Sequence, residues 1–337
     1  MLPHAIYLLD RHTSDFDLVY PSDLRQLIAI EFGSTDLPVI FGEDLQENAD
    51  QFSEVSAIFS TWNMPKLSAR GVSSIFPNLR DVYYAAGTVK YFAEPFIENG
   101  VSIHSAALVN AKPVIEYATA LVMLGAKGFY SSRISRIRHF FAAKSASNAF
   151  PGNYQACVGV LGLGRIGQGV AKAVLQQTDM EVLGYDPYVS AEDCSAIGVK
   201  KAGLDEVFSV CDVITNHMPD TLETRQVISS EVIGMMKETT VFINTARGAQ
   251  VDEKALAVSL KKHPLQSAVL DVTYPEPIRP WNALLGLRNV YVTPHIAGSL
   301  GNEKRRLGEA MLDEYRRISS GDSPLYSVDP ESLSREA

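Results

Sequence analysis

A glycine-rich turn between a short apolar run and a helical pattern constrains this chain more than any other feature. The run Val158–Leu161 leads directly into Gly162–Gly167, which reads GLGRIG, and Val170–Leu175 continues with helical spacing. In such a unit the first glycine permits a tight turn, the second lets a pyrophosphate approach the backbone, and the third lets the helix pack against the strand. The helix N-terminus adds unpaired N–H groups and partial positive charge. The segment therefore predicts a parallel α/β fold that binds a dinucleotide.

The acidic residue after the next predicted strand indicates which dinucleotide is bound. The strand Glu181–Tyr185 ends at Asp186, 19 residues after Gly167. A carboxylate there can accept hydrogen bonds from the adenosine ribose and repels a 2′-phosphate, which favours NAD over NADP. Asp186 could alternatively only open the turn with Pro187, but the glycines and the spacing favour ribose binding. We therefore predict NAD as the cofactor, with contacts from Gly162, Gly164, Arg165, Ile166, Gly167 and Asp186.

The length and the order of the patterns indicate two α/β domains. The chain has 337 residues, whereas a domain usually has about 100–150. Strands alternate with helices in the first hundred residues, and the alternation begins again at Cys157 after a predicted loop that starts at Ser145. Apolar residues at helical spacing predict a helix over Pro113–Gly128, with the proline in its first turn. A last helical pattern, Asn302–Ile318, follows the final strand and could return to the first domain.

Charge and cysteine content exclude several classes of partner. Lys and Arg total 30 against 39 Asp and Glu, and the net charge of −9 would repel a nucleic acid backbone. The three cysteines are too few and too scattered for a disulfide framework or a four-cysteine metal site, which favours a cytoplasmic location. The longest apolar run, Tyr117–Ala126, is shorter than the roughly 20 residues of a membrane span. We expect no signal segment, no bound metal and no membrane association.

Polar residues follow several strands of the second α/β pattern. His217, Arg247, Glu276 and His295 each come after a predicted strand, and ligands of a parallel sheet lie at the carboxyl ends of its strands. A histidine can carry a proton near neutral pH, a neighbouring carboxylate stabilises its charged form, and an arginine grips a carboxylate or carbonyl oxygen. Beside a nicotinamide cofactor, these residue types predict oxidation and reduction of an alcohol and its carbonyl.

Each of these residues also has a structural interpretation. His295 could be a hydrogen-bonded loop histidine, Glu276 a solvated loop acid, and Arg247 a helix cap or the partner of a surface acid. His217 is more readily a pocket-lining residue than an acid or base. The functional interpretation depends on finding the set at successive strand ends of one sheet.

Four segments resemble, in order, the signatures of the D-isomer-specific 2-hydroxyacid dehydrogenase family, over about Val82–Gly298. They are the glycine turn with Asp186, the segment 244–248 (NTARG), Asp271 with the following Glu276-Pro277, and the segment 293–298 (TPHIAG). The resemblance implies that Arg247 binds the substrate carboxylate and carbonyl, that His295 is the acid/base, and that Glu276 is its partner.

The resemblance also implies the remaining site and the architecture. Met218, Pro219, Thr245 and Asp271 would line the cofactor site, and the backbone N–H groups of Ala86, Gly87 and Thr88 would meet the substrate carboxylate. Residues 109–298 would form a Rossmann-type NAD-binding domain, inserted into a smaller, flavodoxin-like parallel α/β substrate domain of residues 1–108 and 299–337. Members of the family are usually homodimers that pair through the cofactor domain.

Some segments depart from the family pattern. Val89-Lys90-Tyr91-Phe92 stands in place of an Asp/Asn-rich stretch beside the substrate loop, and Thr273 stands where a phenylalanine is frequent. The expected activity is NAD-dependent interconversion of a D-2-hydroxy acid and its 2-oxo acid, with glyoxylate, hydroxypyruvate, phosphorylated glycerates and bulkier keto acids all open. Glu276 argues against a formate-type reaction, for which the resemblance predicts glutamine. Four side chains could shape the substrate pocket, namely Trp62, Met64, Lys90 and Trp281. For the two tryptophans, packing in a core or an interface is an equally good interpretation. The alternative is an NAD(H)-sensing, corepressor-like protein with the same fold.

Overall fold

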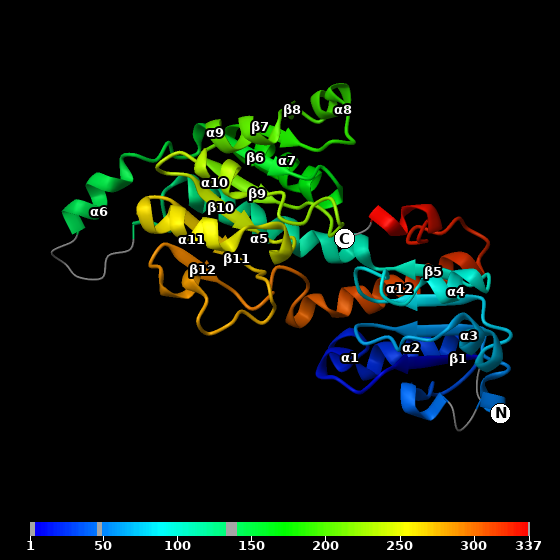
Figure 1. Cartoon of the computed structure of the whole chain (residues 1–337). Helices are drawn as coiled ribbons and strands as arrows, with labels where there is room; N and C mark the ends of the chain where they lie inside the picture. Colours follow the sequence, from blue (N-terminus) through cyan, green and yellow to red (C-terminus); the bar gives the residue numbers. More distant parts are fainter. Residues whose placement is uncertain (1–3, 46–48, 133–139, 336–337) are drawn as a thin grey trace. The chain divides into compact units, whose positions relative to one another are not determined.

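Figure 1 shows the computed structural model of the chain, which describes residues 4–45, 49–132 and 140–335. The chain divides into two compact units, one of Met1–Ala111 with Ser299–Glu336 and one of Lys112–Gly298. From the sequence, the two domain boundaries are predicted after residues 108 and 298.

The first unit is built on a five-stranded parallel sheet with the strand order β2-β1-β3-β4-β5. This order is the flavodoxin-like one, as the fold prediction required. Its strands are β1 (Ala5–Leu9), β2 (Val39–Phe41), β3 (Ala57–Ser60), β4 (Asp81–Tyr84) and β5 (Ser102–Ser105). Its helices are α1 (Ser14–Val19), α2 (Ser22–Glu31), α3 (Ala69–Ile75), α4 (Glu94–Glu98) and α12 (Arg305–Ser319).

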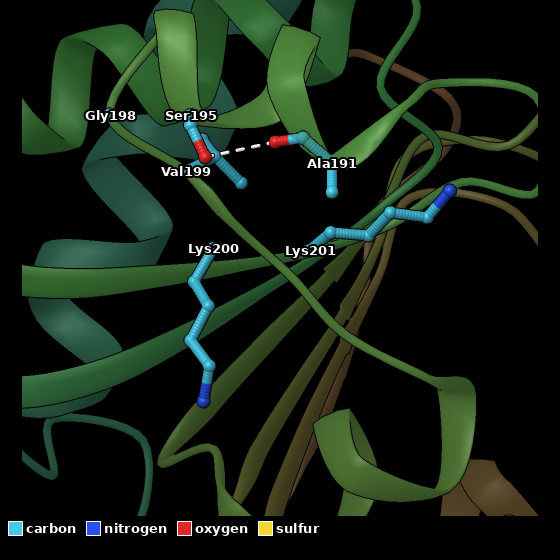
Figure 2. A pocket seen from close by; sticks show the side chains of 6 residues that line it. All are labelled: Ala191, Ser195, Gly198, Val199, Lys200 and Lys201. Carbon is cyan, nitrogen blue, oxygen red and sulfur yellow. Dashed lines mark hydrogen bonds between the residues drawn. The ribbon is translucent and has the colours of Figure 1, made fainter.

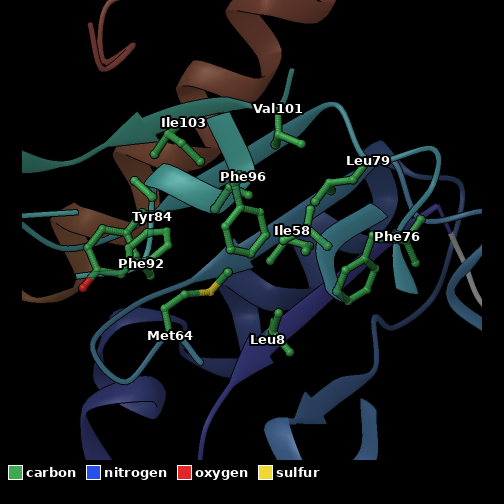
Figure 3. Packing of buried hydrophobic residues seen from close by; sticks show 14 of the residues in the cluster. Leu8, Ile58, Met64, Phe76, Leu79, Tyr84, Phe92, Phe96, Val101 and Ile103 are labelled. Atoms are coloured by element: carbon green, nitrogen blue, oxygen red, sulfur yellow. The ribbon is translucent and has the colours of Figure 1, made fainter. Parts of the chain in front are cut away.

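Successive residues of the central strands face two separate cores, because side chains alternate along a strand. Leu8 and Ile58 point into the core that Figure 3 shows, where Phe96 of α4 packs beside them. Tyr7 and Phe59 point to the opposite face, which α1, α2 and α12 cover. Helix α12 buries Leu307 and Met311 there, so the chain returns to its first unit after leaving the second.

The second unit is built on a seven-stranded parallel sheet with the order β12-β11-β10-β9-β6-β7-β8. Counted from β6, this is 7-6-5-4-1-2-3, the doubly wound order of a Rossmann fold, and the predicted fold class is confirmed. The strands are β6 (Tyr154–Leu161), β7 (Asp179–Tyr185), β8 (Lys200–Lys201), β9 (Val213–Asn216), β10 (Val241–Asn244), β11 (Ser267–Leu270) and β12 (Val290–Val292). The helices are α6 (Phe140–Ser147), α7 (Arg165–Gln177), α8 (Ala191–Ala196), α9 (Leu204–Val210), α10 (Ser230–Gly234) and α11 (Glu253–Lys262).

Helix α5 (Ala107–Ala126) begins six residues earlier than predicted, so Pro113 lies inside the helix and not in its first turn. The prediction was wrong because the residues before the proline are compatible with a helix, and tertiary packing tolerates the one hydrogen bond that proline cannot donate. The prediction that a loop starts at Ser145 was also wrong, because α6 continues to Ser147 and the loop begins after it.

By length and composition, α5 is the one helix among the described residues that could cross a membrane, with a mean hydropathy of 1.3. Packing inside the protein accounts for part of this composition, since 33% of that window is buried. Ala118 and Val122 are buried in a core of the second unit, and the backbone of Gly125 lies so close to Val213 and Val241 that a Cβ would be within 3.4 Å of both. Helix α5 therefore covers the sheet, which accounts for its apolar face.

Candidate active site

The glycine turn follows β6 and starts α7, and its glycines differ in what surrounds them. Gly162 has a positive φ of 82°, and a Cβ there would lie 2.8 Å from the backbone of Met218. A Cβ on Gly167 would lie 1.9 Å from the carbonyl oxygen of Gly162. Gly164, the N-cap of α7, has no heavy atom within 4 Å of its Cβ position. The first and third glycines are required by the fold, whereas the space at the second one fits an approaching pyrophosphate.

Asp186 follows β7 and binds the glycine turn directly. Its Oδ2 accepts the N–H of Leu163 at 2.8 Å, and its Oδ1 accepts the N–H of Tyr188 at 2.9 Å. The carboxylate is therefore fixed beside the turn, and each oxygen retains a lone pair for a further donor such as a ribose hydroxyl.

His217, which follows β9, is held between two hydroxyl groups. Its Nε2 lies 2.9 Å from Oγ1 of Thr215 and its Nδ1 lies 3.3 Å from Oγ1 of Thr245. Burial lowers the pKa of His217 to about 3, so the ring is neutral near pH 7 and carries no proton to a substrate there. This supports the pocket-lining interpretation.

An amide network that the sequence gave no reason to single out fixes the neighbouring strand ends. Asn216 donates to Oδ1 of Asn244 at 3.1 Å and to Oε1 of Gln250 at 2.7 Å. Gln250 donates in turn to the carbonyl oxygens of Met218 and Pro219 at 3.0 and 2.8 Å. All three amides are buried, and they hold the backbone of the two predicted cofactor contacts in place.

Arg247 follows β10 and is half-buried. Asn244 donates to its carbonyl oxygen at 3.0 Å, and its own Nη1 donates to the carbonyl of Ala246 at 2.7 Å. Its side chain makes no hydrogen bond that caps a helix. Within the described ranges, no carboxylate lies within 4.0 Å of the guanidinium. The guanidinium group of Arg247 is therefore available to bind an anion from outside the protein.

Glu276 and His295 come together as the sequence predicted. Oε1 of Glu276 lies 2.8 Å from Nδ1 of His295, with 44% and 47% of the side chains exposed. Their loops follow β11 and β12, which are neighbours in the sheet, and β10 with Arg247 is next to β11. His295 has a positive φ of 56°, a conformation that a non-glycine residue adopts only where its surroundings hold it.

Asp271 supplies much of that support. Its carboxylate accepts the N–H groups of Ile296 and Ala297, each at 2.8 Å, and the hydroxyl of Thr293 at 2.6 Å. Its carbonyl oxygen accepts the N–H of His295 at 3.0 Å. The sequence placed Asp271 among the cofactor contacts, and what the structure shows is a buried acid that organises the loop of His295.

In the first unit, the turn Ala86-Gly87-Thr88 follows β4. The hydroxyl of Ser105 donates to the carbonyl oxygens of Ala86 and Gly87, at 3.1 and 2.6 Å. The N–H of Ala86 donates to the carbonyl oxygen of Tyr84 at 2.9 Å, so its predicted contact with the substrate carboxylate is wrong. In the part of the chain that the structure describes, the N–H groups of Gly87 and Thr88 donate to no protein acceptor. The turn is thus fixed through its carbonyls, with N–H donors left for an anion.

The side chains considered for a substrate pocket fall into different environments. Met64 is buried in the core of the first unit and is a packing residue. Trp62 packs partly against both cores, with Nζ of Lys304 5.7 Å from its ring centre. Trp281 is 77% exposed, with the guanidinium of Arg279 6.0 Å from its ring centre.

A pocket of about 450 Å³ lies beside β8, the edge strand of the second sheet on the side opposite to β12. Figure 2 shows Lys200 and Lys201 pointing to different sides of it. Lys200 pairs with Glu206 at 3.3 Å and Lys201 donates to the carbonyl oxygen of Val189. The width of the sheet separates this pocket from His295, so it does not belong to the site at the strand ends.

Comparison with known proteins shows what this chain is similar to. Residues 129–297 match the family model of the D-isomer specific 2-hydroxyacid dehydrogenase, NAD binding domain. The D-3-phosphoglycerate dehydrogenase of Methanocaldococcus jannaschii is 33% identical over 234 residues, 68% of this chain and 43% of that protein. The chain thus spans less than half the length of that relative. The (S)-sulfolactate dehydrogenase of Chromohalobacter salexigens is 31% identical over 246 residues, 72% of this chain and 78% of the relative.

A solved structure has the same fold over nearly the whole chain. The D-mandelate dehydrogenase of Rhodotorula graminis superposes with a TM-score of 0.79 at 20% sequence identity, covering 96% of this chain and 97% of that one. At this identity the similarity establishes the architecture of both units.

Proposed function

Because the chain belongs to the D-isomer specific 2-hydroxyacid dehydrogenase family, we propose that it is an NAD-dependent oxidoreductase that interconverts a D-2-hydroxy acid and its 2-oxo acid. The observation that carries the proposal is the contact of 2.8 Å between Glu276 and His295. A histidine next to a carboxylate at the strand-end edge of a Rossmann sheet is suited to move the hydroxyl proton.

The proton is carried at Nε2 of His295, since Nδ1 faces Glu276. In the oxidative direction Nε2 accepts the hydroxyl proton of the substrate, and Glu276 stabilises the charged ring. In the reductive direction the charged ring returns the proton to the oxygen. NAD, when bound, supplies the hydride chemistry.

Substrate binding is assigned to cationic and N–H donors. Arg247, whose guanidinium has no acidic partner in the described chain, grips the substrate carboxylate or carbonyl. Of the three N–H groups expected to bind the substrate carboxylate, those of Gly87 and Thr88 are assigned to it, because that of Ala86 already donates to the carbonyl oxygen of Tyr84.

The cofactor contacts are assigned to the edge of the second sheet. The space at Gly164 and the N-terminus of α7 fit the pyrophosphate, and the fixed carboxylate of Asp186 fits the ribose. The residues that line the site in this proposal are Gly162, Gly164, Arg165, Ile166, Gly167, Asp186, Met218, Pro219, Thr245 and Asp271.

A homodimer in the cytoplasm is part of the proposal. Helix α6 has no buried residue and extends away from the rest of its unit in Figure 1, with Phe140 and Phe141 46% and 80% exposed. Adjacent exposed aromatic rings favour burial against a partner. Sedimentation should give twice the chain mass of 36.9 kDa, and a monomer at micromolar concentration contradicts the dimer.

The activity is tested by mixing the protein with NADH and a panel of 2-oxo acids and following the loss of the cofactor's absorbance. The panel includes the oxo forms of phosphoglycerate, sulfolactate and mandelate, because proteins with those names are similar to this chain. His295→Ala should lower kcat by about 10²–10⁴-fold. Absence of turnover with every acid, together with assembly that changes on NADH addition, would favour the sensor alternative.

A further inference from the structure

Glu253, the first residue of α11, binds both ends of the loop that carries Glu276. Its Oε1 accepts the backbone N–H of Tyr274 at 2.7 Å. Its Oε2 accepts a hydrogen bond from Nδ2 of Asn282, also at 2.7 Å. Glu276 lies between these two anchor points, within the segment 274–282.

Apart from the contacts with Glu253 and His295, the hydrogen bonds of the segment 274–282 are local. They include those from the hydroxyl of Thr273 to the carbonyl oxygen of Pro275 at 3.3 Å and from the N–H of Asn282 to the carbonyl oxygen of Arg279 at 2.9 Å. Tyr274 is 68% exposed and Trp281 is 77% exposed, so these two aromatic side chains add little apolar burial to fix the backbone. Asn282 is itself fixed, because its Oδ1 accepts the N–H of Leu284 at 3.0 Å. The two hydrogen bonds of Glu253 involve a charged acceptor, and such bonds are stronger than those between neutral groups.

We propose that Glu253 is a positioning residue, which holds the segment 274–282 so that the carboxylate of Glu276 stays in contact with His295. This inference rests on the proposed function, since it takes Glu276 and His295 as the proton-carrying pair. An exposed ion pair on mobile chain gains little, because ordering its side chains costs entropy. Because Glu253 already fixes both ends of the loop, less conformational entropy is lost when Glu276 contacts His295.

The hydrogen-bond pattern suggests one variant that breaks the bond between Glu253 and Asn282, and a second variant that restores a bond between these two positions. In Glu253→Gln, the new amide oxygen can still accept the N–H of Tyr274, but its NH₂ group faces the NH₂ group of Asn282. Asn282 cannot rotate its amide to compensate, since its Oδ1 already accepts from Leu284. Adding Asn282→Asp restores the bond between positions 253 and 282 with donor and acceptor exchanged, and aspartate also serves as an N-cap at that position.

The first measurement is hydrogen exchange of the NAD-free protein, followed by mass spectrometry. Amides of the segment 274–282 should exchange about tenfold faster in Glu253→Gln, and the double variant should return them to the wild-type rate. The matched control is Glu231→Gln, which changes an exposed acid in the first turn of α10. It should leave the exchange of this segment unchanged.

The second measurement is the reduction of a 2-oxo acid by NADH. Glu253→Gln should lower kcat about tenfold and leave the KM for NADH within twofold. The double variant should recover kcat, and Glu231→Gln should match the wild type.

Unchanged exchange in Glu253→Gln would overturn the inference, and so would a loss of kcat that the double variant does not recover. Glu276→Gln separates the inference from the proposed function. It should lower kcat without changing the exchange of the segment. If Glu276→Gln retains wild-type turnover, the assigned role of Glu276 fails, and the exchange data then still decide whether Glu253 holds the loop.

Discussion

Gly164 and Gly167 lie three residues apart, and alanine should separate what each does. A Cβ at Gly164 meets no atom within 4 Å, and the residue has a φ of −71° that alanine adopts without strain. A Cβ at Gly167 would lie 1.9 Å from the carbonyl oxygen of Gly162 and 3.2 Å from Cγ1 of Val160. The first change leaves the free protein's packing intact, whereas the second forces the turn open.

The magnitudes follow from these distances. Gly164→Ala should change the free energy of unfolding by less than about 1 kcal/mol, because reduced freedom of the unfolded chain offsets a poorer N-cap. Gly167→Ala should cost about 3 kcal/mol, the upper end for overpacking, since a backbone oxygen cannot rotate aside. The methyl group of Gly164→Ala would stand where the pyrophosphate approaches. Losing one or two charge-assisted hydrogen bonds should weaken NADH binding by about 10- to 100-fold.

The assay combines urea unfolding with titration of NADH fluorescence. Gly203→Ala is a matched control, because Gly203 is the N-cap of α9, has a φ of −73° and also has no atom within 4 Å of its Cβ position. It should show the same small change in stability as Gly164→Ala and bind NADH like the wild type. If Gly164→Ala binds NADH within twofold of the wild type, the pyrophosphate does not lie at the second glycine.

Three further predictions address other parts of the molecule. His217 has a pKa of about 3 when folded, below its usual 6.5, so the unfolded state takes up the proton as the pH falls. The free energy of unfolding should therefore fall by up to about 1.4 kcal/mol per pH unit below pH 6.5. In urea unfolding at pH 7 and pH 5, His217→Asn should lose this contribution to the pH dependence, and an equal decrease in the variant and the wild type would contradict the prediction. Asp186→Asn should reduce the preference for NADH over NADPH about tenfold, since it removes a charge that repels the 2′-phosphate; an unchanged ratio of the two dissociation constants excludes the ribose role. Glu314 is 1% exposed and accepts the N–H groups of Leu325 and Tyr326 at 3.1 and 2.8 Å, beside His104; Glu314→Ala should lower the free energy of unfolding by about 3–5 kcal/mol, and a loss below 1 kcal/mol would show that the carboxylate is dispensable.

Features set by neighbouring residues were predictable from the sequence. The glycine turn and Asp186 could be located because each glycine serves a local backbone requirement at fixed spacing. The predicted strands Val158–Leu161 and Glu181–Tyr185 lie within β6 and β7, since runs of β-branched and other apolar residues favour extended chain. Arg247, Glu276 and His295 could be grouped because parallel strands bring their carboxyl ends to one edge. The contact of Glu276 with His295 shows that two of these three side chains meet.

Features set by distant residues were not predictable in this way. Asp271 was placed among the cofactor contacts, yet its carboxylate also holds the loop of His295. Met64, considered for a substrate pocket, is a core residue. Glu253 reads as an ordinary acid in the first turn of a helix, and only the folded loop brings Tyr274 and Asn282 to its two oxygens. Sequence spacing determines which backbone shapes are favourable, whereas a hydrogen-bond partner twenty or more residues away depends on the path of the chain between them.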